Sequence, residues 1–339
     1  MINFANSYHK YVNRFLEINE AAKEAPAELI RQVEGAYRSA VQEVAQEVFS
    51  LKNDCKVIML SGPSGSGKTT TARILQKLLK EKGVSAVQIS LDDFFMGEGK
   101  APILDSGEYD YEDIRALNLE QVENCLLDLS NRGYCKKPTF DFEKKRPMPE
   151  ITEIQLPPGG IAIVEGIHAL NPLVTAHLPE DKILKMYVSV KQGIKDGDEV
   201  ILSPRNLRLV RRLVRDYHFR ATGPEKTLKS WGAVCRGENL FIQPFKRTSD
   251  ITVNSIHIYE PCVLCHDALA LLNSIHPASE FYDTAMDLKR LLEEKEMAND
   301  ETTEHHSEYS FYVSDAAEKF RKFANTVMPF DVPTTNVVN

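Results

Sequence analysis

A glycine-rich stretch holds the first side chains that could do chemistry. The segment LSGPSGSGKTT, residues 60–70, follows an apolar run and satisfies the pattern G-x-x-x-x-G-K-[ST]. Glycines let backbone N–H groups surround phosphate, while the lysine and threonine can reach phosphate oxygens and Mg²⁺. The helical sequence TTTARILQKLLKEKG after the loop completes the required context. We expect ATP to bind at Gly62, Pro63, Ser64, Gly65, Ser66, Gly67, Lys68, Thr69 and Thr70.

A pair of carboxylates follows a second apolar run. In ISLDDFF, residues 89–95, Asp92 and Asp93 come where a predicted strand ends. Open α/β sheets place ligands at the carboxyl ends of their strands, so this pair is expected near the phosphates. Asp92 could accept a proton from an attacking hydroxyl or hold magnesium. The alternative is an aspartate pair that only caps the next turn.

A third apolar run ends in a glutamate. The segment IAIVEGIHALNP, residues 161–172, places Glu165 at the end of a predicted buried strand. With Thr69 and Asp92, it is our candidate for the metal site, often acting through water because Mg²⁺ keeps part of its hydration shell. The alternative is an acid that caps the following turn. We expect His168 to be structural, since a lone histidine is more often packed or hydrogen-bonded than catalytic.

Arginines are concentrated in SPRNLRLVRRLVRDYHFRATG, residues 203–223. Spacings of three, four and seven residues place the arginines at 208, 211, 212 and 215 on one face of a predicted helix. Guanidinium groups suit anions with several oxygens, so this helix could fold over a triphosphate as a lid. A salt-bridged surface and a nucleic-acid groove are the alternatives. The arginines concerned are Arg208, Arg211, Arg212, Arg215 and Arg220.

Composition limits the class of protein. The chain has 339 residues, 42% hydrophobic and 27% charged, with a net charge of −8. This charge argues against a general nucleic-acid binder, because such proteins need a broadly basic face. No apolar run or signal-like N-terminus predicts a membrane span or export, so we expect a cytoplasmic protein. Cys262–His266 matches a haem-attachment pattern, but a partly buried helix is the favoured interpretation.

The order of predicted elements indicates an α/β fold. Apolar positions at helical spacing and Pro26 predict helices in residues 1–54, a helical N-terminal extension. Residues 55–272 alternate strands and helices, which predicts a mainly parallel sheet in a three-layer α/β/α domain. Residues 273–339 form a helical, partly flexible extension with an acidic stretch at 292–308. Strands are expected at 56–61, 86–91, 161–165, 184–190 and 250–254.

In this order, the motifs resemble the uridine kinase and phosphoribulokinase family of P-loop kinases. The resemblance covers about residues 55 to 265. It is strongest to bacterial uridine kinase-like nucleoside kinases, whose relatives often carry a TGS, threonyl-tRNA-synthetase-like region. The motifs are GPSGSGKTT, SLDDFF, GEYDYEDIRALN, KPTFDFEKKRP, VEGIHALNP, RLVRRLVRDYHFR and RGENLFIQPFKRTSDITVNS.

The resemblance implies roles for single residues. Asp92 matches the family base, and Asp93 occupies a less fixed position at the acceptor. Asp110 matches the acid that binds ribose hydroxyls, and Glu165 the metal-side acid. The lid arginines of the family fall on Arg211, Arg212, Arg215 and Arg220. Arg211 and Arg215 are assigned to catalysis together with Lys68, and Arg212 and Arg220 to ATP binding.

Two departures concern the acceptor. Phe140 and Lys145 stand where pyrimidine-specific relatives carry a tyrosine and a histidine that read the base. Phenylalanine keeps stacking without a hydroxyl, and lysine supplies charge without an acceptor atom. We expect a kinase that uses ATP and Mg²⁺ to phosphorylate a small-molecule hydroxyl, with a nucleoside 5′-hydroxyl favoured. A sugar phosphate or pantothenate-like acceptor, a non-catalytic nucleotide-binding regulator and a homo-oligomer stay open.

Overall fold

The structure is a computed structural model that describes residues 13–51, 55–142, 144–293, 310–313 and 334–337. These residues fall into two compact units. The first contains Arg38–Ser189 and Ala233–Ser255. The second contains the described residues up to Tyr37, Val190–Gly232 and the described residues from Ile256 onward. The division of the chain into residues 1–54, 55–272 and 273–339 stays a prediction.

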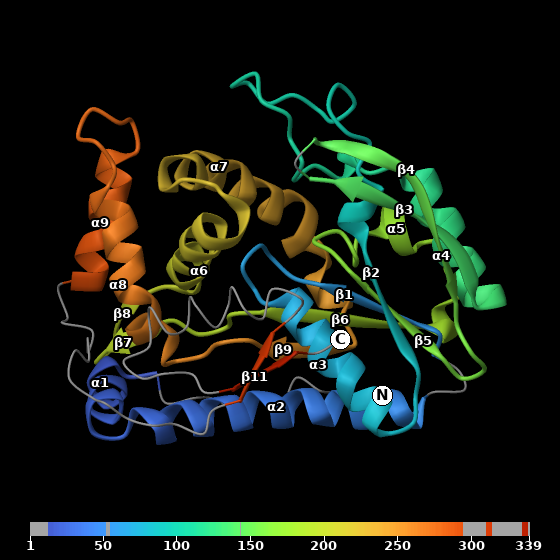
Figure 1. Ribbon diagram of the computed structural model, residues 1–339, viewed down its shortest axis with the longest axis horizontal. Coiled ribbons are helices and arrows are strands. Elements are labelled where there is room, and N and C mark those ends of the chain that lie inside the picture. The colour runs from blue at the N-terminus through green and yellow to red at the C-terminus, as the bar shows by residue number, and fades with distance from the viewer. Residues whose placement is uncertain (1–12, 52–54, 143, 294–309, 314–333, 338–339) are drawn as a thin grey trace. The chain divides into compact units, whose positions relative to one another are not determined.

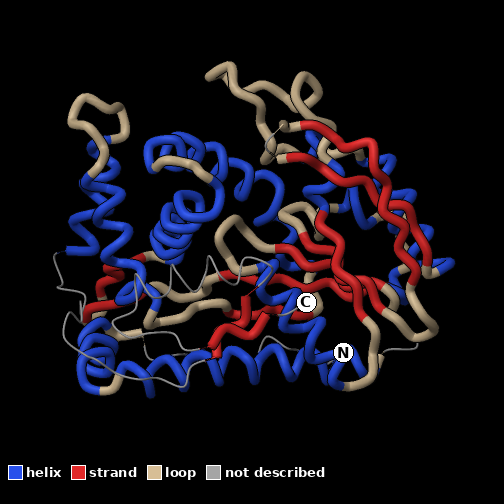
Figure 2. The backbone as a smooth tube through the Cα atoms, viewed as in Figure 1, coloured by secondary structure: helices blue, strands red, loops and turns tan. Residues whose placement is uncertain are grey.

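A parallel sheet forms the centre of the first unit (Figures 1 and 2). Its strand order is β2-β5-β1-β6-β9, and every neighbouring pair runs parallel. All five residues of β1 and of β5 are buried, as expected of strands covered on both faces. The predicted strands are confirmed, with bounds β1 Val57–Ser61, β2 Ala86–Ser90, β5 Ile161–Glu165, β6 Ile183–Ser189 and β9 Ile251–Asn254.

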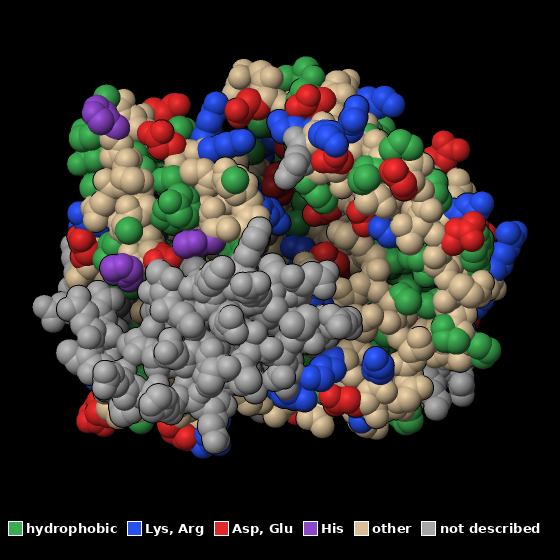
Figure 3. Space-filling model, viewed as in Figure 1, with side chains coloured by type: hydrophobic (Ala, Val, Ile, Leu, Met, Phe, Trp, Pro, Cys, Tyr) green, Lys and Arg blue, Asp and Glu red, His purple; other side chains and the backbone are tan. Residues whose placement is uncertain are grey.

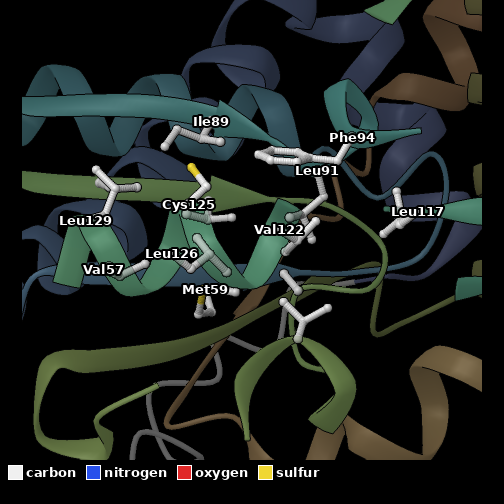
Figure 4. Packing of buried hydrophobic residues seen from close by; sticks show 14 of the residues in the cluster. Val57, Met59, Ile89, Leu91, Phe94, Leu117, Val122, Cys125, Leu126 and Leu129 are labelled. Carbon is white, nitrogen blue, oxygen red and sulfur yellow. The ribbon is translucent and has the colours of Figure 1, made fainter. Parts of the chain in front are cut away.

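Two helices cover opposite faces of this sheet. Helix α4, Leu119–Arg132, packs Val122, Leu126 and other apolar side chains into one cluster with Val57 and Met59 of β1 (Figure 4). Side chains alternate along a strand, so the intervening residues of β1 point to the other face. Helix α3, Lys68–Glu81, contacts β1, β2 and β5 there. This layering confirms the predicted α/β/α architecture.

An antiparallel hairpin adds to the first unit a feature that the strand predictions did not include. It consists of β3, Tyr134–Asp141, and β4, Arg146–Gln155, and Figure 2 shows its strands as two long neighbouring red stretches of the tube. Nine of the ten residues of β4 are exposed, which leaves little apolar periodicity to read in the sequence. Short helical elements complete the unit: η2 Leu91–Phe94, η3 Ile114–Ala116, α5 Pro172–Thr175, η4 Glu180–Lys182, the π-helical turn η5 Glu238–Ile242 and η6 Gln243–Thr248.

The second unit is built mainly from helices. Helix α1 spans Phe15–Glu24, and α2, Pro26–Ser50, starts at the predicted proline and contributes residues to both units. The other elements are β7 Ile194–Asp196, β8 Glu199–Leu202, α6 Pro204–Arg220, α8 Glu260–Asn273, α9 Tyr282–Glu293 and α7 Pro224–Gly237, whose residues from Ala233 onward belong to the first unit. Side chains of α1, α6, α8 and α9 share one apolar core. The Cys262–His266 segment lies in α8, as the helical interpretation predicts.

Beyond α9, two short strands pair in parallel, β10 Ser310–Val313 and β11 Thr334–Val337. The predicted C-terminal extension is helical at α9, and these two strands are an addition that the prediction did not include. The first twelve residues and most of the acidic stretch at 292–308 lie outside the described residues.

Most of the cysteines lie in the interior of the protein. Cys55, Cys125, Cys135 and Cys265 are buried, and the Sγ atoms of Cys125 and Cys135 are 2.8 Å apart. Burial raises the pKa of the Cys55 thiol to about 12 and that of Cys265 to about 11.

On the face shown in Figure 3, Lys and Arg side chains lie interspersed with Asp and Glu. Among the described residues, no helix has the length and apolar character needed to cross a bilayer.

Candidate active site

The predicted phosphate loop connects β1 to α3 through a tightly constrained backbone. Gly65 and Gly67 adopt left-handed conformations, with φ of 74° and 83°, which favour glycine. A Cβ atom on Gly62 would lie 2.0 Å from the carbonyl oxygen of Val188 at the end of β6. Gly67 is the residue before the first turn of α3, whose free N–H groups favour an anion. The loop therefore has the backbone form that phosphate binding requires.

Side chains of the loop are oriented by nearby groups. The Lys68 ammonium donates to the carbonyl oxygen of Pro63 across the loop, at 3.3 Å. The Thr69 hydroxyl donates to Glu165 Oε1 at 3.1 Å, which joins the start of α3 to the end of β5. Carboxylate and hydroxyl oxygens are ligands that Mg²⁺ accepts, so this pair fits a metal site beside the phosphates. We call Gly62–Thr70 together with Glu165 the donor side.

The predicted aspartate pair follows β2, the next strand but one to β1 in the sheet. Asp92 and Asp93 lie in η2, where the Ser90 hydroxyl accepts a hydrogen bond from the Asp92 backbone N–H at 3.3 Å. Both side chains are half-buried. The Lys137 ammonium of β3 lies 2.5 Å from Asp93 Oδ2, so the hairpin is tied to the strand end by an ion pair. The carboxyl ends of β1, β2 and β5 thus bring the loop, the aspartates and Glu165 to one edge of the sheet.

Asp110 lies in the loop before η3. Its side chain is almost fully buried and forms an ion pair with Arg236 near the end of α7. Gly237 packs closely there, since a Cβ on it would lie 2.6 Å from the Glu112 Cβ. Glycine at 237 therefore lets the end of α7 approach the Asp110 loop.

Aromatic side chains gather between these acids and the hairpin. Phe95 contacts Tyr111 and Phe140 edge-on, with ring centroids 5.4 and 5.7 Å away. Phe140 is buried, while Phe142 is 60% exposed. We call the following five residues the ring cluster, since each contacts at least one other: Phe95, Tyr109, Tyr111, Phe140 and Phe142. The ring cluster, Asp92, Asp93, Asp110 and their charged partners form the acceptor side.

The hairpin turn completes the acceptor side. Lys145 takes a left-handed φ of 48°, and its carbonyl oxygen accepts a hydrogen bond from the Glu98 backbone N–H at 3.1 Å. Its ammonium also pairs with the Glu98 carboxylate at 3.1 Å. The turn is thereby joined to the loop that follows Asp92 and Asp93.

Several charges on and near the acceptor side are paired. Each of four cations faces a carboxylate in this unit: Lys137 with Asp93, Lys145 with Glu98, Arg236 with Asp110 and Arg115 with Asp113. Burial alone would raise the pKa of Asp113. Hydrogen bonds from Arg115 and its positive charge hold that pKa below its ordinary value. Paired charges present little net field to a bound molecule.

His168 is buried at the other end of the short loop after Glu165. Its ring contacts Phe241 edge-on, with centroids 5.7 Å apart. Burial lowers its pKa to about 4, and Lys68 lowers it further, while Asp113 and the Glu112 backbone act in the opposite direction. The imidazole is therefore neutral at pH 7, in keeping with the structural role expected for it.

The predicted lid arginines belong to the second unit, where α6 confirms the expected helix. Arg211 pairs with Glu260 of α8, with Nε at 2.7 Å from Oε2. Arg208 is buried over the ring of Trp231, 5.7 Å from its centroid. The other three surround the buried Asp216, at 3.2 Å for Arg212, 2.6 Å for Arg215 and 3.7 Å for Arg220. One carboxylate thus orients three guanidinium groups.

Three residues of the acceptor side escaped the sequence interpretation. Lys137 and Arg236 pair with predicted acids, and Tyr111 joins the ring cluster. Each lies inside a motif that carries the family resemblance, which was the available signal. The pairing itself links residues up to 126 positions apart, which spacing along a chain does not reveal.

A glycine loop that precedes a helix, with acids at the ends of adjoining parallel strands, defines a P-loop kinase site. The model of the phosphoribulokinase/uridine kinase family matches residues 57–260. The chain therefore belongs to the phosphoribulokinase/uridine kinase family. It is a kinase that phosphorylates a hydroxyl group of a small molecule.

Individual relatives cover this region at modest identity. Uridine kinase of Bacillus subtilis (strain 168) is 27% identical over 198 residues, which is 58% of this chain and 84% of the relative. Uridine kinase of Staphylococcus haemolyticus (strain JCSC1435) is 30% identical over 198 residues, with 58% and 86% covered. Phosphoribulokinase from Rhodobacter spheroides superposes with a TM-score of 0.41 at 17% identity, covering 59% of this chain and 70% of that chain.

Proposed function

We propose that this kinase transfers the γ-phosphate of ATP to the 5′-hydroxyl of a nucleoside. The ion-paired cations of the acceptor side, beside the ring cluster, carry the proposal. Aromatic rings favour a planar, partly apolar group, and paired cations offer no uncompensated charge to an anionic acceptor. A nucleoside is neutral and planar at one end and carries hydroxyl groups at the other. The similarity to uridine kinases supports the same class of acceptor.

On the donor side, backbone N–H groups of Gly62–Thr70 bind the phosphates and Lys68 contacts the transferring group. Thr69, Asp92 and Glu165 are the residues that would hold Mg²⁺, directly or through water. The metal ion supplies charge neutralisation at the phosphate oxygens. Arg211, Arg212, Arg215 and Arg220 are proposed to add positive charge to the transition state, as lid residues.

On the acceptor side, Asp92 removes the proton of the hydroxyl as its oxygen attacks the γ-phosphorus. The bond from that phosphorus to the bridging oxygen breaks, and ADP leaves with the electron pair. Asp110 accepts hydrogen bonds from the ribose hydroxyls, and the ion pair with Arg236 positions its carboxylate. Asp93, Phe140 and Lys145 line the place where the rest of the acceptor binds.

Two alternatives remain for the experiment to decide. A sugar phosphate or pantothenate-like alcohol would need an anion site, which the paired cations argue against. A nucleotide-binding regulator would keep the loop without turnover.

The test is ADP release from the full chain with ATP and Mg²⁺, across nucleosides, sugar phosphates and pantothenate. We expect nucleosides to raise ADP release well above the basal rate. Asp92→Asn should then lower kcat by about 10² to 10⁴ while the Kd for ATP stays unchanged. Asp181→Asn, at an exposed residue of η4, is the matched control. Turnover of sugar phosphates alone, or basal release with every acceptor, would contradict the proposal.

A further inference from the structure

One hydroxyl of the ring cluster is buried without a polar partner. The Tyr111 phenol oxygen is screened from solvent, and none of the described residues offers it a hydrogen bond. Burying a polar group without a hydrogen-bond partner destabilises the folded protein. Such groups are uncommon in native proteins, and each calls for an explanation.

The surroundings of Tyr111 place it within the acceptor side. Its ring meets Phe95 at 5.4 Å and Tyr109 at 6.5 Å between centroids, and Phe95 in turn meets the buried Phe140. The preceding residue is Asp110, which pairs with Arg236. Lys145 and Glu98, where the hairpin turn meets the loop after Asp93, act electrostatically on the phenol.

The state of the hydroxyl fixes which ligand atoms it suits. Burial raises the pKa of Tyr111 above its ordinary value, so the phenol is protonated near pH 7. A protonated phenol donates one hydrogen bond and can accept another. The rings around it favour a flat partner that presents its faces to aromatic edges. An exocyclic carbonyl oxygen or an unprotonated ring nitrogen at the edge of a nucleobase meets both requirements.

We propose that Tyr111 is a specificity-determining residue whose hydroxyl donates a hydrogen bond to the polar edge of the acceptor's base. This inference rests on the proposed nucleoside kinase function and adds the group that recognises the base. Phe140 supplies a stacking surface without a polar atom, and Lys145 already pairs with Glu98. Tyr111 therefore carries the polar contact that the ring cluster needs in order to discriminate between bases.

The test compares wild type with Tyr111→Phe, which removes one oxygen and keeps the ring. We expect kcat/KM for the preferred nucleoside to fall about fivefold to tenfold, with the KM for ATP unchanged. We expect the same kcat/KM in both proteins for 1,4-anhydroribitol. This compound keeps the furanose and its free hydroxymethyl group but has no base. Because the hydroxyl is unpaired in the free protein, the Tm of the variant should equal or exceed that of wild type.

Tyr282→Phe is the matched control, since Tyr282 lies in α9 of the second unit, outside the acceptor side, and its hydroxyl is not one of the buried unpaired groups. It should leave the selectivity between bases unchanged. Nucleoside turnover with the same base selectivity in Tyr111→Phe would overturn this inference alone, as would a lower Tm with unchanged acceptor kinetics. A wild-type enzyme that turns over no nucleoside would overturn the proposed function as well.

Discussion

The donor side is built mostly from backbone, whereas the acceptor side is built from side chains. Gly62, Gly65 and Gly67 shape the phosphate loop by conformations and close contacts that other residues cannot match. On the acceptor side, Phe95, Phe140 and Tyr111 owe their positions to ring contacts between distant segments. Phosphate is the same in every nucleotide, but acceptors differ. A fixed backbone cradle therefore suits the donor, and replaceable side chains suit the acceptor.

Because the donor side depends on its backbone, we expect the largest effect of a single substitution at a glycine of the phosphate loop. Gly62→Ala would place a Cβ 2.0 Å from the Val188 carbonyl oxygen, so the loop must move. We expect the affinity for ATP to fall about 10²-fold, from a cost of about 3 kcal/mol. Calorimetric titration with a non-hydrolysable ATP analogue measures it. Gly232→Ala in α7, where the added Cβ meets nothing within 4 Å, is the control. Equal ATP affinity in both variants would break the comparison.

The next largest effect is expected in the pH dependence of folding stability, through the buried side chain of His168. Its pKa is about 4 when folded and 6.5 ordinarily, so only the unfolded chain takes up a proton between these values. Its stabilising contribution is complete above pH 6.5 and is lost as the pH falls toward 4. Between pH 7.5 and 5, wild type should lose about 2 kcal/mol more stability than His168→Gln. Urea unfolding at both pH values measures this, and parallel losses would contradict it.

A smaller effect is expected from the ring cluster. Phe140→Leu keeps an apolar side chain but removes an aromatic contact worth about 1 kcal/mol. The KM for the nucleoside should rise about fivefold and the KM for ATP should stay constant. Steady-state kinetics with each substrate varied in turn separates the two sides. Phe281→Leu, at a partly buried residue that packs against the core of the second unit, controls for general loss of packing. A rise in both KM values would show that the two sides are not independent.

The smallest effect tests the charge balance. Glu98→Gln removes the carboxylate that faces Lys145, an exposed pair of the kind worth less than about 1 kcal/mol. The acceptor side then gains one net positive charge. The ratio of kcat/KM for phosphorylated sugars to that for nucleosides should rise about threefold. An unchanged ratio at low ionic strength would show that local charge does not select the acceptor.

The two sides also differ in how well the sequence predicts them. The phosphate loop, its strand and its helix were predicted to within two residues, because glycine spacing and apolar periodicity are local signals. Asp92 and Glu165 were placed correctly at strand ends for the same reason. Their catalytic and metal-binding roles stay predictions.

The acceptor side depends on long-range pairing. Arg236 meets Asp110 across 126 positions, and Lys137 meets Asp93 across 44. The exposed strand β4 lacks the alternation that reveals a half-buried strand, so the hairpin was missed as an element. The orientation of three arginines by Asp216 depends on side-chain geometry that helical spacing alone does not specify.

Each unit contains buried cysteines, so the opening of the two units can be measured separately. Cys55, Cys125 and Cys135 lie in the first unit and Cys265 in the second, all shielded from reagents in the native state. A thiol-reactive label should reach them only when the surrounding core opens. Mass spectrometry of the labelled peptides would then give separate opening rates for the kinase core and for the unit that carries the arginine helix, from one sample and without any substitution.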